Sequence, residues 1–245
     1  MTEVEIKKHK MAAERLEAVK NATFKFISKN IGKTSEYDVN KFILSEFKKR
    51  GLEPDDDYSA VIVAVDQNAA IPHYLPKKDK SAKIKGNCLV LIDIWAKLNG
   101  DNAPFADISW VGYTGKDIPL EIKTAFDRVI GARNFAVKFI QESLRKKRLP
   151  DTQEVQSAVT KHFGKMEKYF IHGAGHSLGI QKCHGNYFRF SRKSSAKMKI
   201  EIPFTIEPGL YFPGRFGIRS EINCYIDRDY QMRITTKVQK EIIKI

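Results

Sequence analysis

The sequence predicts an α+β fold made of two similar halves, roughly residues 1–115 and 116–245, within one domain covering residues 1–245. Two observations predict this organisation. The order helix, helix, strand occurs twice along the chain, at an offset of about 115 residues. Two pairs of carboxylates repeat at nearly the same offset, which favours two related structural units over a chance coincidence.

The composition is that of an ordinary globular protein, with 42% apolar and 29% charged residues. No apolar run reaches the roughly 20 residues that span a bilayer, and residues 1–20 are charged from the start, unlike a secretory signal. Three cysteines, Cys88, Cys183 and Cys224, are odd in number and far apart. This pattern is neither a disulfide framework nor a zinc finger. We therefore expect a cytoplasmic protein with no membrane association.

The formal net charge of +14 comes from lysines spread between Lys7 and Lys244, with only short basic clusters such as residues 145–148. Nucleic-acid-binding proteins more often gather basic residues on one element and interleave aromatic residues for base stacking. We expect a solvated, lysine-rich surface with no specific nucleic-acid partner and at most a weak attraction for acidic ones.

In the first half, apolar residues at spacings of three and four predict an amphipathic helix over residues 12–26. After a break at Gly32, Ser35 and Asp38 resemble a capping box, and the second helix ends at Gly51. Two short apolar runs then predict buried strands. The strands are expected at residues 60–65 and 88–92.

The second half repeats this order. A long helix is predicted over residues 122–144, and Asp151 with Glu154 is expected to cap a shorter helix that ends near Phe163. Strands are expected to begin at residues 169–171 and 204–206.

The two carboxylate pairs are Asp93 with Asp107 and Glu207 with Glu221, and the residues of each pair are 14 positions apart. Both intervals are centred on turn-forming residues, which predicts that each pair faces its partner across an antiparallel hairpin. Four clustered carboxylates cannot all remain ionised without a strong positive charge, which divalent cations supply. The alternative, exposed acids at hairpin tips, is disfavoured because Asp93 and Glu207 both follow apolar strand-like runs.

Histidines support a metal site. His172, His176 and His184 lie in one short stretch, interrupted by glycines that permit close approach of the backbone. His9 and His162 lie on helices of charged character, and we expect both at the surface. An oxygen-rich site with one imidazole suits Mn²⁺, Co²⁺ or Fe²⁺, and Zn²⁺ less distinctively.

Taken together, these motifs resemble those of the pita-bread metallopeptidases, which include methionine aminopeptidase, aminopeptidase P and prolidase. The resemblance implies a pita-bread fold, in which two pseudo-symmetric halves surround a curved antiparallel sheet. The matching segments are Asn68–Tyr74, Leu91–Asp93, Ala106–Ile108, His172–Gly179, Glu207–Tyr211 and Gly217–Glu221.

The resemblance also implies a role for each site residue. Two divalent metal ions are expected, most readily Mn²⁺. Glu207 would also shuttle a proton, and four further residues would contact the substrate, the three histidines among them acting in catalysis. The implied ligands are Asp93 for one metal, His176 and Glu207 for the other, and Asp107 and Glu221 bridging both; the implied substrate-binding residues are His73, His172, His184 and Arg219.

Within this family, His172 and Arg219 resemble the Xaa-Pro branch of aminopeptidase P and prolidase. The resemblance implies a dinuclear exopeptidase that hydrolyses the amino-terminal peptide bond of short peptides, with Xaa-Pro bonds favoured. A methionine-type aminopeptidase and a catalytically silent binding module of the same fold remain alternatives. Trp95, in place of a common glycine, and a shifted His184 depart from the usual pattern and bear on the shape of the substrate pocket. A monomer or homodimer is expected.

Overall fold

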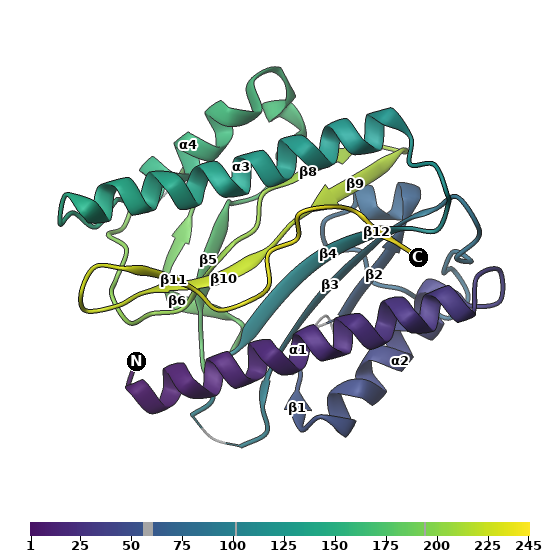
Figure 1. Cartoon of the computed structure of the whole chain (residues 1–245), viewed down its shortest axis with the longest axis horizontal. Helices are drawn as coiled ribbons and strands as arrows, with labels where there is room; N and C mark the ends of the chain where they lie inside the picture. Colours follow the sequence, from purple (N-terminus) through teal and green to yellow (C-terminus); the bar gives the residue numbers. More distant parts are fainter. Residues whose placement is uncertain (56–60, 101, 194) are drawn as a thin grey trace.

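The computed structural model describes residues 1–55, 61–100, 102–193 and 195–245. Two pairs of helices enclose the strands, with α1 (Glu3–Lys29) and α2 (Glu36–Lys49) on one side and α3 (Leu120–Arg145) and α4 (Thr152–Phe163) on the other (Figure 1). The predicted α+β class and all four predicted helices are confirmed.

The helices begin where the sequence supplies caps. Ser35 and Asp38 form the predicted capping box of α2, and Asp151 and Glu154 form that of α4. A third capping box, from Thr2, starts α1 at Glu3, about two and a half turns before the predicted helix. These reciprocal hydrogen bonds satisfy backbone N–H groups that a helix start otherwise leaves without partners.

The first sheet has the order β1-β3-β4-β12, with β2 also paired to β3. Its carboxy-terminal strand, β12, runs parallel to β4, so the end of the chain completes the sheet of the first half (Figure 1). The predicted strand at residues 60–65 is β2, although Ala60 lies outside the described residues. The strand bounds are Leu52–Glu53 for β1, Val61–Val65 for β2, Leu89–Leu98 for β3, Ala106–Tyr113 for β4 and Ile243–Lys244 for β12.

The second sheet has the order β11-β10-β7-β5-β6, and a separate hairpin is formed by β8 and β9. The predicted strand at residues 204–206 is β7. The bounds are Gly175–Leu178 for β5, His184–Phe190 for β6, Phe204–Ile206 for β7, Gly209–Phe212 for β8, Phe216–Arg219 for β9, Ile222–Ile226 for β10 and Met232–Ile234 for β11; two 3₁₀ helices, η1 and η2, span Asp66–Ala70 and Gly164–Tyr169.

The strand predicted at residues 169–171 is wrong. Tyr169 ends η2, and the segment from Phe170 to the start of β5 is irregular. Phe170 is buried because its ring packs 5.1 Å from that of Phe163, whereas Ile171 is 60% exposed. The apolar run therefore reflects one helix contact and not a sheet ladder.

The two hairpins differ in how well their register was predicted. In β3–β4, Asp93 lies opposite Ser109 and Trp95 lies opposite Asp107, so Asp93 and Asp107 are diagonal neighbours and their predicted direct opposition is wrong. They still share one face, since side chains alternate with a period of two. In the second half, the β7–β10 and β8–β9 ladders have a common register, which places Glu207 opposite Glu221 as predicted.

Packing decides which face of the first sheet carries the site. Ile92 and Ile94 of β3 pack in the cluster beneath α1 and α2, whereas Leu91 packs in the cluster beneath α3 and α4. Asp93 and Trp95 alternate with the first set and therefore face away from α1, toward the second half. None of the described helices has an apolar stretch of the length and hydropathy needed to cross a membrane.

His9 was predicted at the surface, and this prediction is wrong. The imidazole is 0% exposed, with Nδ1 2.8 Å from the carbonyl oxygen of Phe105 and Nε2 2.8 Å from Oγ1 of Thr235. His162 is half-buried rather than fully exposed, with its ring stacked at 5.3 Å on Phe135.

Candidate metal centre and active site

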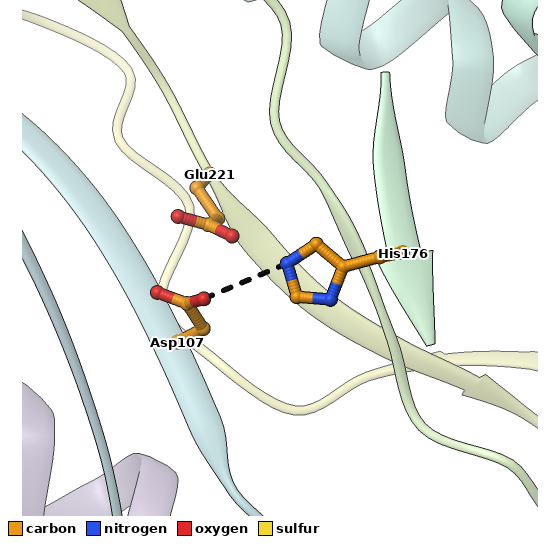
Figure 2. A group of neighbouring side chains, drawn as sticks. All are labelled: Asp107, His176 and Glu221. Carbon is orange, nitrogen blue, oxygen red and sulfur yellow. Dashed lines mark ion pairs between the residues drawn. The ribbon is translucent and has the colours of Figure 1, made fainter. Parts of the chain in front are cut away.

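Five side chains from both halves converge between the two sheets. Nε2 of His176 lies 3.8 Å from Oδ2 of Asp107 and 3.4 Å from Oε1 of Glu207. One ligand atom each from Asp107, His176 and Glu221 lie within 4.8 Å of one another, and Figure 2 shows the three side chains pointing toward a common point. The fifth, Asp93, lines the same cavity but hydrogen-bonds to Arg219.

Three carboxylate oxygens in this group are buried and have no hydrogen-bond donor among the described residues. They are Oδ1 of Asp93, Oδ1 of Asp107 and Oε1 of Glu221. A buried acceptor without a partner costs free energy, and native proteins rarely leave one unexplained. A divalent cation would satisfy all three oxygens, so the residues present fit a metal site.

Burial sets the protonation of the carboxylates. It raises the pKa of Asp107 and Glu221 well above the ordinary range, and nearby carboxylates raise both further. Burial also raises the pKa of Glu207 to about 8, although Arg219 opposes the shift. All three pKa values are shifted upward, which indicates that this carboxylate cluster needs additional positive charge to remain ionised.

His176 presents a free lone pair to the cluster. Burial lowers its pKa to about 3, so the ring is neutral near pH 7. Nδ1 lies 3.0 Å from the carbonyl oxygen of Ser177, which can only accept, so the ring proton is on Nδ1. The opposite nitrogen, Nε2, therefore faces Asp107 and Glu207 unprotonated, as a metal-ligating imidazole requires.

Polar residues that the sequence did not single out orient these carboxylates. Asn223 bridges β10 to β4: its Oδ1 accepts from the backbone N–H of Asp107 at 2.9 Å, and its Nδ2 donates to the carbonyl of Asp107. Ser109 donates to Oε2 of Glu221 at 2.9 Å, and Thr205 donates to Oε1 of Glu207 at 3.3 Å. Ser109 shares a strand face with Asp107, so the period of two could have identified it.

Arg219 is buried, and its contacts are with the site itself. Nε donates to Oγ of Ser109 at 2.9 Å, Nη1 donates to Oη of Tyr211 at 2.8 Å and to the carbonyl of Pro72 at 3.2 Å, and Nη2 donates to Asp93. Most of its five N–H groups are thus engaged within the protein.

The other predicted residues line the cavity of about 740 Å³ above this cluster. His172 is held by its Nδ1–H, which donates to the carbonyl of Gly173 at 2.7 Å, and by Tyr211, whose hydroxyl lies 2.7 Å from Nε2. The rings of His184 and His176 are 4.0 Å apart, and His73 lines the same cavity from the segment after η1. The structure therefore brings all nine histidine, carboxylate and arginine side chains predicted for the site to one cavity, with His184 exposed at its edge.

Further residues complete the walls. The apolar lining residues are Leu75, Trp95, Phe170 and Ile171. A basic rim lies at the end of β6 and just after it. The thiol of Cys183 is buried with Sγ 3.3 Å from Oδ2 of Asp107. Burial and the neighbouring carboxylate raise the pKa of this thiol well above its ordinary value, so it is neutral and donates to Asp107. The basic rim consists of Arg189, Arg192 and Lys193.

Residues 7–228 match the sequence profile of metallopeptidase family M24. The chain belongs to this family. An uncharacterized peptidase of Methanocaldococcus jannaschii is 28% identical over 223 residues, which cover 89% of this chain and 58% of that one. A Xaa-Pro dipeptidase of Pyrococcus furiosus is 28% identical over 182 residues, which cover 74% of this chain and 48% of that one.

Solved structures of a prolidase and an X-Pro aminopeptidase share the fold of this chain. Prolidase from Thermococcus sibiricus superposes with a TM-score of 0.81 at 28% identity, and X-Pro aminopeptidase from Thermotoga maritima with 0.84 at 24% identity. The matches cover 100% of this M24 chain and 62% and 64% of theirs. The chain thus spans about half to two thirds of the length of these relatives. The pita-bread fold and the family resemblance are confirmed.

Proposed function

We propose that this M24 metallopeptidase is a dinuclear exopeptidase that releases the amino-terminal residue of short peptides, with Xaa-Pro bonds preferred. One observation carries the proposal: three buried carboxylate oxygens that have no donor in the described part of the chain lie together with Nε2 of His176 at the base of a cavity of about 740 Å³. Relatives described as Xaa-Pro dipeptidase and X-Pro aminopeptidase support the substrate preference.

In this proposal, the ligands are Asp93, Asp107, His176, Glu207 and Glu221. Divalent cations held there would lower the pKa of a bound water and polarise the scissile carbonyl. Glu207 is the candidate for proton transfer because its side chain is 17% exposed, more than those of Asp107 and His176, and borders the cavity. It would accept a proton from the attacking water and return it to the leaving amine.

The histidines would orient the substrate. His73 and His184 border the cavity from opposite halves of the chain and would hydrogen-bond the peptide carbonyl groups. His172, fixed by Tyr211, would line the leaving-group side. A Xaa-Pro bond has no N–H to donate, so the apolar walls at Phe170 and Trp95 would have to recognise the shape of the ring.

The proposal includes Mn²⁺ as the resident ion, with Co²⁺, Fe²⁺ or Zn²⁺ as substitutes, because carboxylates dominate the ligand set. It also includes a single catalytic domain over residues 1–245 acting as a monomer or homodimer in the cytoplasm. The cytoplasmic location is supported by Cys88, Cys183 and Cys224, which are all free thiols.

A peptide panel with measured metal content tests the proposal. Xaa-Pro dipeptides, Xaa-Pro-Yaa tripeptides and Met-Ala peptides are incubated with the protein and Mn²⁺ or Co²⁺. We expect cleavage of the proline peptides and, for Glu207→Gln, a rate lower by about 10²–10⁴-fold with metal still bound. Glu201→Gln, on a side chain paired with Arg228 away from the cavity, is the matched control and should retain the rate.

The alternatives give different results in the same panel. If the protein cleaves only the Met-Ala peptides of the panel, its specificity is that of a methionine aminopeptidase and the proposed Xaa-Pro preference is wrong. Metal-loaded protein that binds peptides and cleaves none would identify a binding module. A near-normal rate for Glu207→Gln would contradict the proton-transfer role.

A further inference from the structure

Glu36, the first residue of α2, is a completely buried carboxylate outside the proposed active site. Its side chain is 0% exposed and is absent from the lining of the cavity. Glu36 makes no ion pair with a basic side chain among the residues the structure describes. Burying a charge without a counter-charge is costly unless hydrogen bonds replace its hydration. The contacts of Glu36 therefore indicate what it is used for.

Both oxygens of Glu36 accept hydrogen bonds, and every partner is a donor. Oε1 accepts from the backbone N–H of Val65 at 2.8 Å and from Nδ2 of Asn68 at 2.9 Å. Oε2 accepts from the hydroxyl of Tyr74 at 2.7 Å, from the N–H of Ala82 at 2.8 Å and from Asn68 at 3.1 Å. Both carboxylate oxygens of Glu36 thus serve as acceptors for groups on the segment around His73.

The four donor residues share one property: they flank His73 in the chain. Val65 and Asn68 precede it, and Tyr74 and Ala82 follow it. After η1 ends at Ala70, the chain forms neither helix nor strand until β3 begins at Leu89. No sheet ladder fixes the segment that carries His73. Backbone hydrogen bonds join its far end to the start of α2, at an isolated bridge between Ser35 and Lys83, and the side chain of Glu36 adds hydrogen bonds to both flanks of His73.

The opposite side of the same segment contacts β9. A Cβ atom on Gly217 would lie 1.9 Å from the carbonyl oxygen of Ala69, so the two backbones touch. Arg219, the last residue of β9, donates to the carbonyl of Pro72 at 3.2 Å and also to Asp93. The His73 segment is thus held between Glu36 and the strand that contacts the proposed metal ligands.

We infer that Glu36 is a positioning residue that fixes His73 at the cavity through the hydrogen bonds to both of its flanks. The inference rests on the proposed function for the part that assigns His73 to the substrate. Glu36 itself touches neither the cavity nor the proposed ligands, so its loss should impair the use of substrate while leaving metal binding unchanged.

Glu36→Gln tests the inference with the full chain. The variant has the same shape but turns an NH₂ group toward donors that now lack an acceptor. Hydrogen–deuterium exchange over residues 66–82 should become faster, with metal content unchanged. The value of kcat/KM for a Xaa-Pro peptide should fall by about 10–100-fold, as losses of supporting hydrogen bonds at metal sites do. Tyr74→Phe removes a single donor and gives a milder version of the same test if Glu36→Gln does not fold.

Two controls separate positioning from general destabilisation. Glu46→Gln removes another buried carboxylate of α2, one paired with Lys49 and Arg50, and should leave both the exchange of residues 66–82 and kcat/KM unchanged. The double variant Glu36→Gln with His73→Ala should be no slower than His73→Ala alone, because Glu36 affects turnover by positioning His73.

The outcomes are decisive in either direction. Unchanged exchange at residues 66–82 in Glu36→Gln, or multiplicative losses in the double variant, would overturn the inference. If the wild-type protein cleaves no peptide, the proposed function fails. The exchange measurement then still decides whether Glu36 holds the segment.

Discussion

The guanidinium of Arg219 forms an ion pair with the carboxylate of Asp93 in which the two side chains are only 4% and 9% exposed. The pair joins β9 of the second half to β3 of the first, beside the proposed metal site. Removing one member of such a buried pair leaves an uncompensated charge, which is far costlier than loss of a surface pair.

Arg219→Met should therefore destabilise the metal-free protein by about 3–5 kcal/mol. The cost should be smaller with Mn²⁺ present, because a cation beside Asp93 supplies the missing positive charge. Denaturant unfolding with EDTA and with Mn²⁺ measures both values. Arg228→Met, which removes a largely exposed partner of Glu201, is the control and should change little. Equal losses under both conditions would argue against a cation at Asp93.

Removal of divalent metal should lower the stability of the wild-type protein. An ion that binds only the folded state at 100 times its Kd adds about 2.7 kcal/mol, so thermal unfolding should shift upward when Mn²⁺ follows EDTA treatment. Asp107→Asn should lose most of this shift. Glu142→Gln, which alters an exposed carboxylate on α3, should keep it. A Tm insensitive to the ion in the wild type would contradict the metal site.

His9 should make stability depend on pH. Burial lowers its pKa to about 4 from the ordinary 6.5, so between these values the unfolded chain binds the proton more readily than the folded one. Its contribution is complete above pH 6.5 and is lost as the pH falls toward 4, by about 3 kcal/mol in total. Unfolding free energies of the wild type and of His9→Gln are measured from pH 8 to 4. The difference between them at each pH gives the contribution of His9 to stability. A difference that does not vary with pH would refute the assignment.

Gly217→Ala should disturb the cavity wall as well as stability. The added Cβ would lie 1.9 Å from the carbonyl oxygen of Ala69, so β9 or η1 must move. We expect a loss of about 1–3 kcal/mol, as for other overpacked sites, together with a lower kcat/KM. Gly86→Ala is the matched control, since its Cβ would meet nothing within 4 Å. Wild-type stability in Gly217→Ala would show that the contact is easily relieved.

Local features of this chain were predictable because their causes lie within a few residues. The capping boxes of Ser35 with Asp38 and of Asp151 with Glu154 need only four consecutive positions. The register of the second hairpin follows from a tight turn in which Gly214 adopts a φ of 70°, a conformation that glycine tolerates. The longer connection between β3 and β4 fixes its register less tightly, and there the predicted pairing of Asp93 was two residues in error.

The segments that were predicted wrongly depend on distant neighbours. Phe170 and Ile171 have the composition of a strand, but none of the described strands pairs with them. His9 lies on a helix rich in charged residues, yet Phe105 and Thr235 enclose its ring from far along the chain. No local pattern encodes such neighbours, since they meet only when elements pack.

By itself, the sequence determined the α+β class, the repeated order of elements and the residue types from which a metal site could be built. The tertiary structure alone decided that Arg219 pairs with Asp93, that His9 is buried and that Glu36 secures the segment bearing His73. Periodicity and capping are short-range effects and are visible in neighbouring residues. Buried hydrogen bonds join residues from separate elements, and their partners are chosen by packing.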